Sequence, residues 1–247
     1  MALCSSAVVK LGGSLITLKD RPMTVDGEVL RSIASQLSEY RERGGVLMGV
    51  VHGGGSFGHY AVRSIVERKG GLEVGDAPQI QLAMISLALM VVRELSSKGI
   101  KASLHPPHTY CWGGECFLRP LLRDIEVGLV PVTFGDAVPR KNVLEIVSGD
   151  DLAYLLARES GSECLVFATR VEGVLRGDGS LVRILRSLEE FEDLGGVDAT
   201  GGMRRKVEMA LRASESGVRR VVIVSGDNLL DALLGREVGT RVEAVGR

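Results

Sequence analysis

The sequence predicts an α/β fold with an open, mainly parallel sheet that is covered by helices on both faces. Short runs rich in β-branched residues alternate with longer segments of helical period, which is the pattern of consecutive βαβ units. Several of these runs are apolar without interruption, as strands buried on both faces are. With 247 residues and a hydrophobic content of 45%, the chain is long enough to bury a substantial core.

The predicted strands are spread along the whole chain, with segments of helical period between them. They are residues 7–11, 46–51, 101–104, 130–134, 144–147, 164–168, 181–184, 219–224 and 242–245. Residues 29–43 place their apolar side chains on one helical stripe, and similar stripes follow Ser56, Pro78, Gly149, Gly201 and Asp227. No Pro/Ser-rich linker divides residues 1–247, so we expect a single domain, with lobes of about residues 1–148 and 149–247.

Charge and hydropathy exclude several partner classes. Thirty basic residues against 31 acidic ones give a net charge of −1, so we expect no nucleic-acid or anionic-membrane partner. The amino terminus lacks the pattern of a secretory signal, because Lys10 interrupts its only apolar run, and a cytoplasmic location is expected. The most apolar stretch, residues 80–92, is shorter than the roughly 20 residues that cross a bilayer and predicts a buried helix.

The cysteines are scattered and predict reduced, partly buried thiols. They are Cys4, Cys111, Cys116 and Cys164. The pair at 111 and 116 has no second ligand pair at zinc spacing, although His105 and His108 lie nearby, so a metal site is the less favoured alternative.

Three glycine-rich turns follow predicted strands, at residues 12–14, 52–56 and 148–151. This is where open α/β sheets bind ligands. Glycine permits close backbone approach, so that successive N–H groups can converge on an anion at the start of the next helix. None of the turns matches the P-loop or the dinucleotide fingerprint, and each one alone could be only a tight turn.

Lys10 is the most informative single residue, because it interrupts an apolar strand immediately before a double glycine. A charge at that position needs a partner, which favours a functional role. Lys19 lies nine residues further on, and Lys206 lies early in a helix that follows residues 198–202. A lone lysine is normally a solvated surface residue, so these two are weaker candidates alone.

Taken together, these segments resemble the ordered signature of the amino acid kinase family. They are Val9-Lys10-Leu11-Gly12-Gly13-Ser14, the triple glycine at 53–55, Ser148-Gly149-Asp150-Asp151, and Thr200-Gly201-Gly202-Met203 with Lys206. The resemblance implies a three-layer αβα sandwich, an acceptor in the N-terminal lobe, ATP in the C-terminal lobe, Mg²⁺ and a homodimer.

Within that family, three segments are similar to the isopentenyl phosphate kinases. They are Ile16-Thr17-Leu18-Lys19, the string His-Gly-Gly-Gly-Ser-Phe-Gly-His at 52–59, and Pro131-Val132-Thr133-Phe134-Gly135-Asp136. The resemblance implies transfer of phosphate from ATP to isopentenyl phosphate, giving isopentenyl diphosphate for isoprenoid biosynthesis by an alternative mevalonate route. Dimethylallyl phosphate is expected as a further acceptor.

The resemblance also implies roles for individual residues. Lys10 and Lys206 would stabilise the phosphates, Lys19 would assist, Asp150 would hold the lysines, and His59 would donate a hydrogen bond to the acceptor phosphate. Acceptor binding is expected from Gly54, Gly55, His59 and Gly149. Nucleotide binding is expected from Lys10, Gly12, Gly13, Thr169, Gly173, Gly201, Gly202 and Lys206. No protein residue is expected as a metal ligand, and His52 is expected to be structural.

A five-carbon tail also needs an apolar pocket, and the stretch at 80–92 offers side chains for one, although most should be core. They are Leu82, Met84, Ile85, Leu89 and Met90.

The chain departs from the family at one position and leaves two other functions open. Where the family commonly has Thr-Asp-Val-x-Gly, this chain reads Thr169-Arg170-Val171-Glu172-Gly173. Arg170 could add a phosphate contact, alter nucleotide preference or change how Mg²⁺ is held. The alternatives are a kinase for another phosphate or phosphonate acceptor, and a non-catalytic sensor of a phosphorylated ligand.

Overall fold

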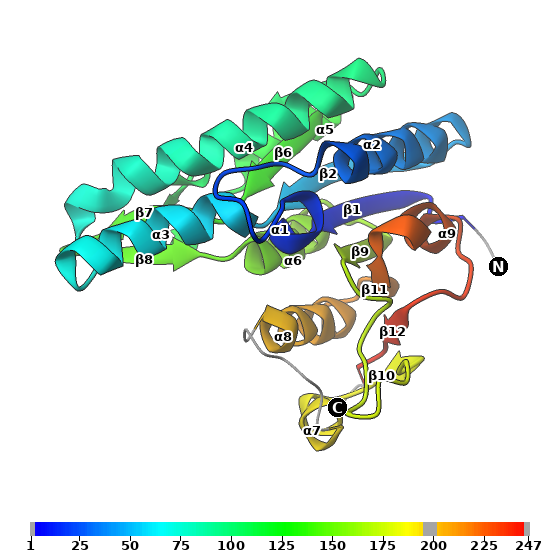
Figure 1. Ribbon diagram of the computed structural model, residues 1–247. Coiled ribbons are helices and arrows are strands. Elements are labelled where there is room, and N and C mark those ends of the chain that lie inside the picture. Colours follow the sequence, from blue (N-terminus) through cyan, green and yellow to red (C-terminus); the bar gives the residue numbers. More distant parts are fainter. Residues whose placement is uncertain (1–2, 195–201, 245–247) are drawn as a thin grey trace.

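The computed structural model describes residues 3–194 and 202–244, which form an αβα sandwich around one eight-stranded sheet (Figure 1). The strand order is β10-β12-β11-β9-β1-β2-β6-β3, and every neighbouring pair is parallel except β11 and β12. The strands are β1 Ser6–Leu11, β2 Val46–His52, β3 Ala102–Leu104, β6 Val130–Phe134, β9 Cys164–Thr169, β10 Ile184–Leu185, β11 Arg220–Ser225 and β12 Thr240–Val242. The predicted fold class is confirmed.

Helices cover both faces of this sheet. On one face lie α2 Gly27–Glu42, α4 Ala77–Ser97 and α9 Leu229–Leu233, and on the other lie α5 Arg119–Glu126, α6 Gly149–Glu159 and α8 Gly202–Glu215. The alternation of β1 separates the two cores, since Ala7, Val9 and Leu11 pack into the first and Val8 into the second. Lys10 has the parity of Val8 and therefore lies on the α6 face.

A second group of elements extends from the carboxyl edge of the sheet as an arm (Figure 1). It consists of α3 Gly55–Lys69, the end of α4 that packs against it, and the antiparallel hairpin of β7 Asp136–Arg140 with β8 Val143–Val147. A small core of residues including Ile65, Met84 and Phe134 holds these parts together. The predicted strand at 144–147 is therefore outside the central sheet.

Other predicted boundaries are only partly correct. Residues 181–184 contribute one bridge, between Leu175 and Leu181, and the regular strand begins at Ile184. The last strand begins at Thr240 rather than at 242, and residue 245 lies outside the described residues. The short elements α1 Gly13–Ile16, β4 Cys111–Trp112, β5 Glu115–Cys116 and α7 Leu188–Asp193 carry too few residues for a periodic signal.

The apolar helix α4 is longer than the stretch that predicts it. Residues Val74–Ser97 are the only helical segment in the described part of the chain that is long and apolar enough to cross a membrane. Eight of its side chains, such as Leu87 and Val91, are buried in the domain, and the helix packs on β3 and β6. This packing is that of a core helix.

Disulfides pair all the cysteines, which corrects the expectation of reduced thiols. Cys4 is bonded to Cys164, 160 positions away, and Cys111 is bonded to Cys116 across the β4–β5 hairpin. The first pair depends on β1 lying beside β9, where Ala7 pairs with Cys164, and sequence spacing carries no sign of it. The thiolates that a zinc site would require are not available.

Candidate active site

Lys10, Asp150 and Lys206 form one buried cluster at the carboxyl edge of the sheet. Lys10 comes from β1, Asp150 from the first turn of α6, and Lys206 from α8. The Asp150 carboxylate oxygen Oδ1 lies 2.7 Å from Lys10 Nζ and 3.1 Å from Lys206 Nζ. All three side chains are less than 10% exposed. The structure thus brings together three predicted residues from distant parts of the chain.

The cluster holds two cations against one anion. Burial alone would raise the pKa of Asp150, but the two lysines outweigh it and hold that pKa at about 2. Burial and the neighbouring Lys10 lower the pKa of Lys206 to about 8, although Asp150 opposes the shift. Lys206 Nζ also lies 5.5 Å from the ring centroid of Phe167. A buried excess of positive charge is costly without a partner, so this site is suited to an anion.

The first two glycine turns contact each other through their backbones. A Cβ atom at Gly13 would lie 2.1 Å from the backbone nitrogen of Gly55, and a Cβ atom at Gly55 would lie 2.2 Å from Thr17 Oγ1. Gly55 also has a φ of +48°, which favours glycine. Thr17 Oγ1 donates to Gly13 O and accepts from Ser56 N–H, at 2.8 and 2.9 Å. The two turns therefore form one rigid junction.

The third turn joins the same junction through Gly149. A Cβ atom at Gly149 would lie 2.9 Å from the carbonyl oxygen of His52, so the start of α6 packs directly on the end of β2. His52 Nδ1 lies 3.1 Å from Gly53 O, and the ring stacks on Phe134. Burial, together with the charge of Lys10, lowers the pKa of His52 to about 4, which keeps the ring neutral. The expected structural role of His52 fits these contacts.

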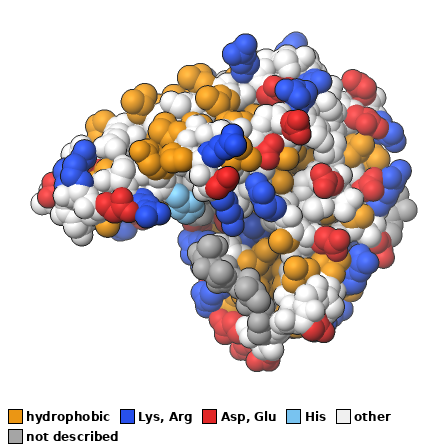
Figure 2. Space-filling view, in the orientation of Figure 1, with side chains coloured by type: hydrophobic (Ala, Val, Ile, Leu, Met, Phe, Trp, Pro, Cys, Tyr) orange, Lys and Arg blue, Asp and Glu red, His pale blue; other side chains and the backbone are white. Residues whose placement is uncertain are grey.

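His59 and Lys19 are not part of the buried cluster. His59 lies on the second turn of α3, and Lys19 lies in the loop that follows α1; both are exposed. Within the described ranges 3–194 and 202–244, neither side chain has a hydrogen bond or ion pair. The space-filling view shows a hollow beneath the arm, bordered by histidine and Lys/Arg side chains (Figure 2).

The predicted nucleotide residues divide into two groups. Gly12 follows the strand that carries Lys10 and donates its N–H to Ala168 O at 2.8 Å. Gly202 is exposed and begins α8, the helix that carries Lys206. Thr169 donates its hydroxyl to Val171 O, and a Cβ atom at Gly173 would lie 2.6 Å from Thr240 Oγ1. These last two have packing roles in the structure. Gly201 lies outside the described residues.

Sequence reasoning missed how α4 contacts the second glycine turn. Met84 is buried, and its sulfur lies where Cβ atoms at Gly54 or Gly58 would approach within 3.2 and 3.1 Å. Three of the expected pocket side chains instead lie on the outer face of α4. Leu82, Leu89 and Met90 are 66%, 54% and 45% exposed. The expectation that they line an apolar pocket or belong to the core is wrong for this chain, because they lie on the exposed face of α4, whereas Met84 lies on the buried face.

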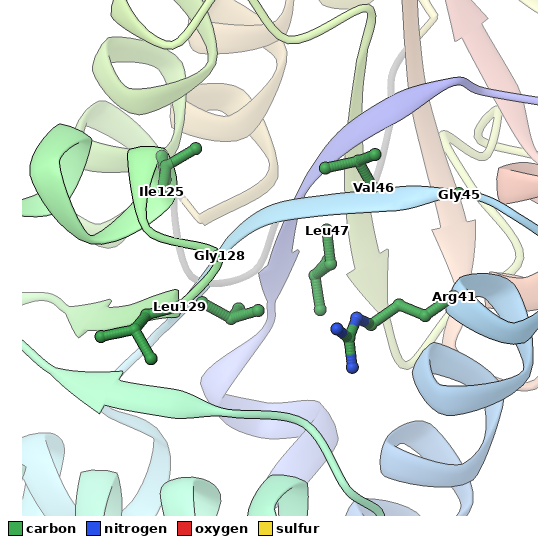
Figure 3. Close-up of a pocket in the computed structure, with 8 residues that line it drawn as sticks. Arg41, Gly45, Val46, Leu47, Ile125, Gly128 and Leu129 are labelled. Atoms are coloured by element: carbon green, nitrogen blue, oxygen red, sulfur yellow. The ribbon is translucent and has the colours of Figure 1, made fainter.

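A shallow pocket of about 180 Å³ lies at the other end of the sheet, where β2 and β6 begin (Figure 3). Arg41, Val46, Leu47 and Leu129 are among the residues that line it. One cation without converging polar groups does not make an anion site, and the pocket is separated from the glycine turns by the length of the strands. It has no part in the site described above.

A three-layer αβα sandwich with glycine turns around a lysine–aspartate–lysine cluster defines a phosphotransferase that acts on small molecules. The chain belongs to the amino acid kinase family, whose model matches residues 6–225. It is 35% identical to the isopentenyl phosphate kinase of Haloferax volcanii over 84% of this chain and 88% of that one. It is 32% identical to the isopentenyl phosphate kinase of Methanothermobacter thermautotrophicus, over 95% and 98%.

A solved structure is similar over almost the whole length. The product complex of T. acidophilum isopentenyl phosphate kinase has a TM-score of 0.79 and 27% identity, covering 96% of this chain and 99% of that one.

Proposed function

We propose that this protein transfers the γ-phosphoryl group of ATP to isopentenyl phosphate, giving ADP and isopentenyl diphosphate. The observation that carries the proposal is the buried, net-positive cluster of Lys10, Asp150 and Lys206 beside two interlocked glycine turns. The similarity to isopentenyl phosphate kinases supports this acceptor. As part of the proposal, we place the enzyme in isoprenoid biosynthesis by an alternative mevalonate route, which the same similarity supports.

The chemistry requires charge balance more than proton transfer. An oxygen of the acceptor monophosphate attacks the γ-phosphorus, a new P–O bond forms, and the bond to the leaving ADP oxygen breaks. The acceptor needs no general base, because a phosphate monoester has a second pKa of about 6 and is mostly a dianion at neutral pH. Lys10 and Lys206 offset the charge of the two polyanions, and Asp150 fixes both ammonium groups.

Within this proposal the acceptor binds to about residues 1–148 and ATP to about residues 149–247. The acceptor phosphate would contact Gly54, Gly55, Gly149 and His59. The described residues contain no group of three His, Cys, Asp or Glu side chains that could bind Mg²⁺. Asp150 is already paired with two lysines. Mg²⁺ therefore enters the proposal only with the phosphates of ATP.

We include a homodimer and a cytoplasmic location in the proposal. The exposed Leu82, Leu89 and Met90 form an apolar surface on α4, of the kind that a second copy can cover (Figure 2). Sedimentation of the wild type and of Leu89→Glu tests this surface, and a monomeric wild type would reject it.

Cell fractionation tests the cytoplasmic location. The two disulfides make this test informative, because disulfides are unusual in cytoplasmic proteins outside hyperthermophiles.

ADP release with different acceptors tests the function directly. The purified protein is assayed with Mg-ATP and isopentenyl phosphate, dimethylallyl phosphate, fosfomycin, UMP or acetylglutamate. We expect turnover with the two isoprenoid phosphates. Turnover with only one of the other acceptors would show that the protein is an amino acid kinase family member with a different substrate. Ligand-induced thermal stabilisation without ADP release would indicate a sensor instead.

Replacing His59 tests the acceptor side of the site. We expect His59→Ala to lower kcat/KM for isopentenyl phosphate about 10- to 150-fold, the value of one charged hydrogen bond. His59→Gln, which keeps a donor, should recover part of the loss. Glu67→Ala, on a later exposed turn of α3, is the matched control. Unchanged kcat/KM in His59→Ala would reject the assigned contact.

The pH profile tests the charge of Lys206. Its pKa is lowered to about 8, so the free enzyme loses this cation as the pH rises through that value. We expect kcat/KM for ATP to fall about tenfold per pH unit above the pKa, because that parameter follows the ionisation of free enzyme. Lys206→Arg, which stays charged, should move this limb to higher pH. A wild-type profile that stays flat to pH 10 would contradict the expectation.

A further inference from the structure

The Arg170 side chain, which replaces the acid expected after β9, is directed at the backbone of α1. Its Nε donates to Ser14 O at 2.8 Å, and an Nη donates to Thr17 O at 3.2 Å. α1 has only four residues, so its last carbonyl groups have no partners within the helix. A guanidinium group can satisfy two carbonyl oxygens at once and places positive charge at the negative helix end.

α1 contains part of the first glycine turn and contacts the second one. It begins directly after Gly12, whose N–H is bonded to Ala168 O of β9. Its C-cap residue Thr17 is bonded to Gly13 O and to Ser56 N–H of the second turn. α1 is thus attached to the acceptor side through Thr17 and to the nucleotide side through Arg170.

We propose that Arg170 is a positioning residue for phosphoryl transfer, which fixes α1, and with it the junction of the two glycine turns, relative to the carboxyl end of β9. The reaction itself rests on the proposed function. In-line transfer depends on alignment, and a displacement of about 1 Å can reduce the rate about 100-fold. An aspartate at this position could not make these contacts, because a carboxylate and a carbonyl are both acceptors.

Four variants separate positioning from charge. They are Arg170→Ala, Arg170→Lys, Arg170→Asp and, as the control, Arg176→Ala at an exposed position six residues further on. We expect Arg170→Ala and Arg170→Lys to lose kcat to a similar extent, about 10- to 100-fold, because one ammonium group cannot span both carbonyls. KM for ATP should change less than about threefold, since a positioning residue contributes little to substrate binding. Arg170→Asp should have the lowest kcat, and Arg176→Ala should match the wild type.

Two results would overturn the proposal. Full activity in Arg170→Lys would show that only the charge matters. A raised KM for ATP with unchanged kcat would show that Arg170 contacts the nucleotide instead.

Hydrogen exchange without substrates provides a readout independent of turnover. The amides of residues 12–18 should exchange faster in Arg170→Ala and Arg170→Lys than in the wild type or Arg176→Ala, because α1 loses its second attachment. Equal exchange in all four proteins would overturn the positioning role. An inactive wild type would reject the proposed function and leave the exchange result valid, so the two failures can be told apart.

Discussion

Lys10→Met is expected to lower kcat about 100- to 1000-fold, because it removes one preorganised charge from the site of phosphoryl transfer. Methionine has nearly the length of lysine and suits a position that is 5% exposed among apolar strands. The fold should therefore persist, and the change should fall on the chemical step. Single-turnover formation of isopentenyl diphosphate at saturating substrate measures that step.

A control for this experiment lies at the opposite edge of the sheet. Lys101 is exposed where β3 is about to begin, and Lys101→Met should leave kcat unchanged. If kcat of Lys10→Met were within about threefold of the wild-type value, the reacting phosphates would have to lie elsewhere. Removing a charge that contacts them should lower kcat by more than that.

Asp150→Asn is expected to lower the free energy of unfolding by about 3–5 kcal/mol, the usual cost of removing one partner from a buried ion pair. The substitution keeps the shape of the side chain but leaves two buried ammonium groups facing each other. Denaturant unfolding at pH 7 measures the loss. A difference below about 1 kcal/mol would show that the lysines are neutral or hydrated in the folded protein.

The sign of the pH dependence provides a second check on Asp150. Its pKa falls from 3.8 to about 2 on folding, so its contribution is fully present above pH 4 and is lost as the pH falls towards 2. The stability difference between wild type and Asp150→Asn should therefore narrow below about pH 4. Asp151→Asn is the matched control, since Asp151 pairs with the half-exposed Arg205 and should cost about 1 kcal/mol at most.

The sequence was sufficient for elements whose signal is local and periodic. The apolar stripe at 29–43 predicts α2 within two residues, and short runs rich in apolar and β-branched residues predict β1, β2, β6 and β9 closely. It failed for β7, where Pro139 and the exposed Arg140 hide the strand pattern. β8 pairs with β7 because a turn joins the two strands and β7 packs on α4. The sequence pattern of a single strand shows neither feature.

The sequence indicated which residues belong to the buried cluster, but not which atoms they contact. Lys10 could be found because it is a charge within an apolar strand, and Asp150 and Lys206 through their motifs. Their meeting at one oxygen depends on tertiary structure, since Asp150 is 56 positions from Lys206. The bonds of Arg170 could not be predicted, because they go to backbone carbonyls, which every residue possesses.

The backbone contact of Gly13 with Gly55 also bears on how acceptor preference can evolve. A side chain at either position would collide with the opposite turn, so this half of the site is closed to mutation. Met84 contacts the same turn from α4 through a flexible thioether, which tolerates replacement. If the acceptor binds at the second glycine turn, as we propose, a lineage can alter this side of the site through α4 while it inherits the Lys10, Asp150 and Lys206 cluster intact.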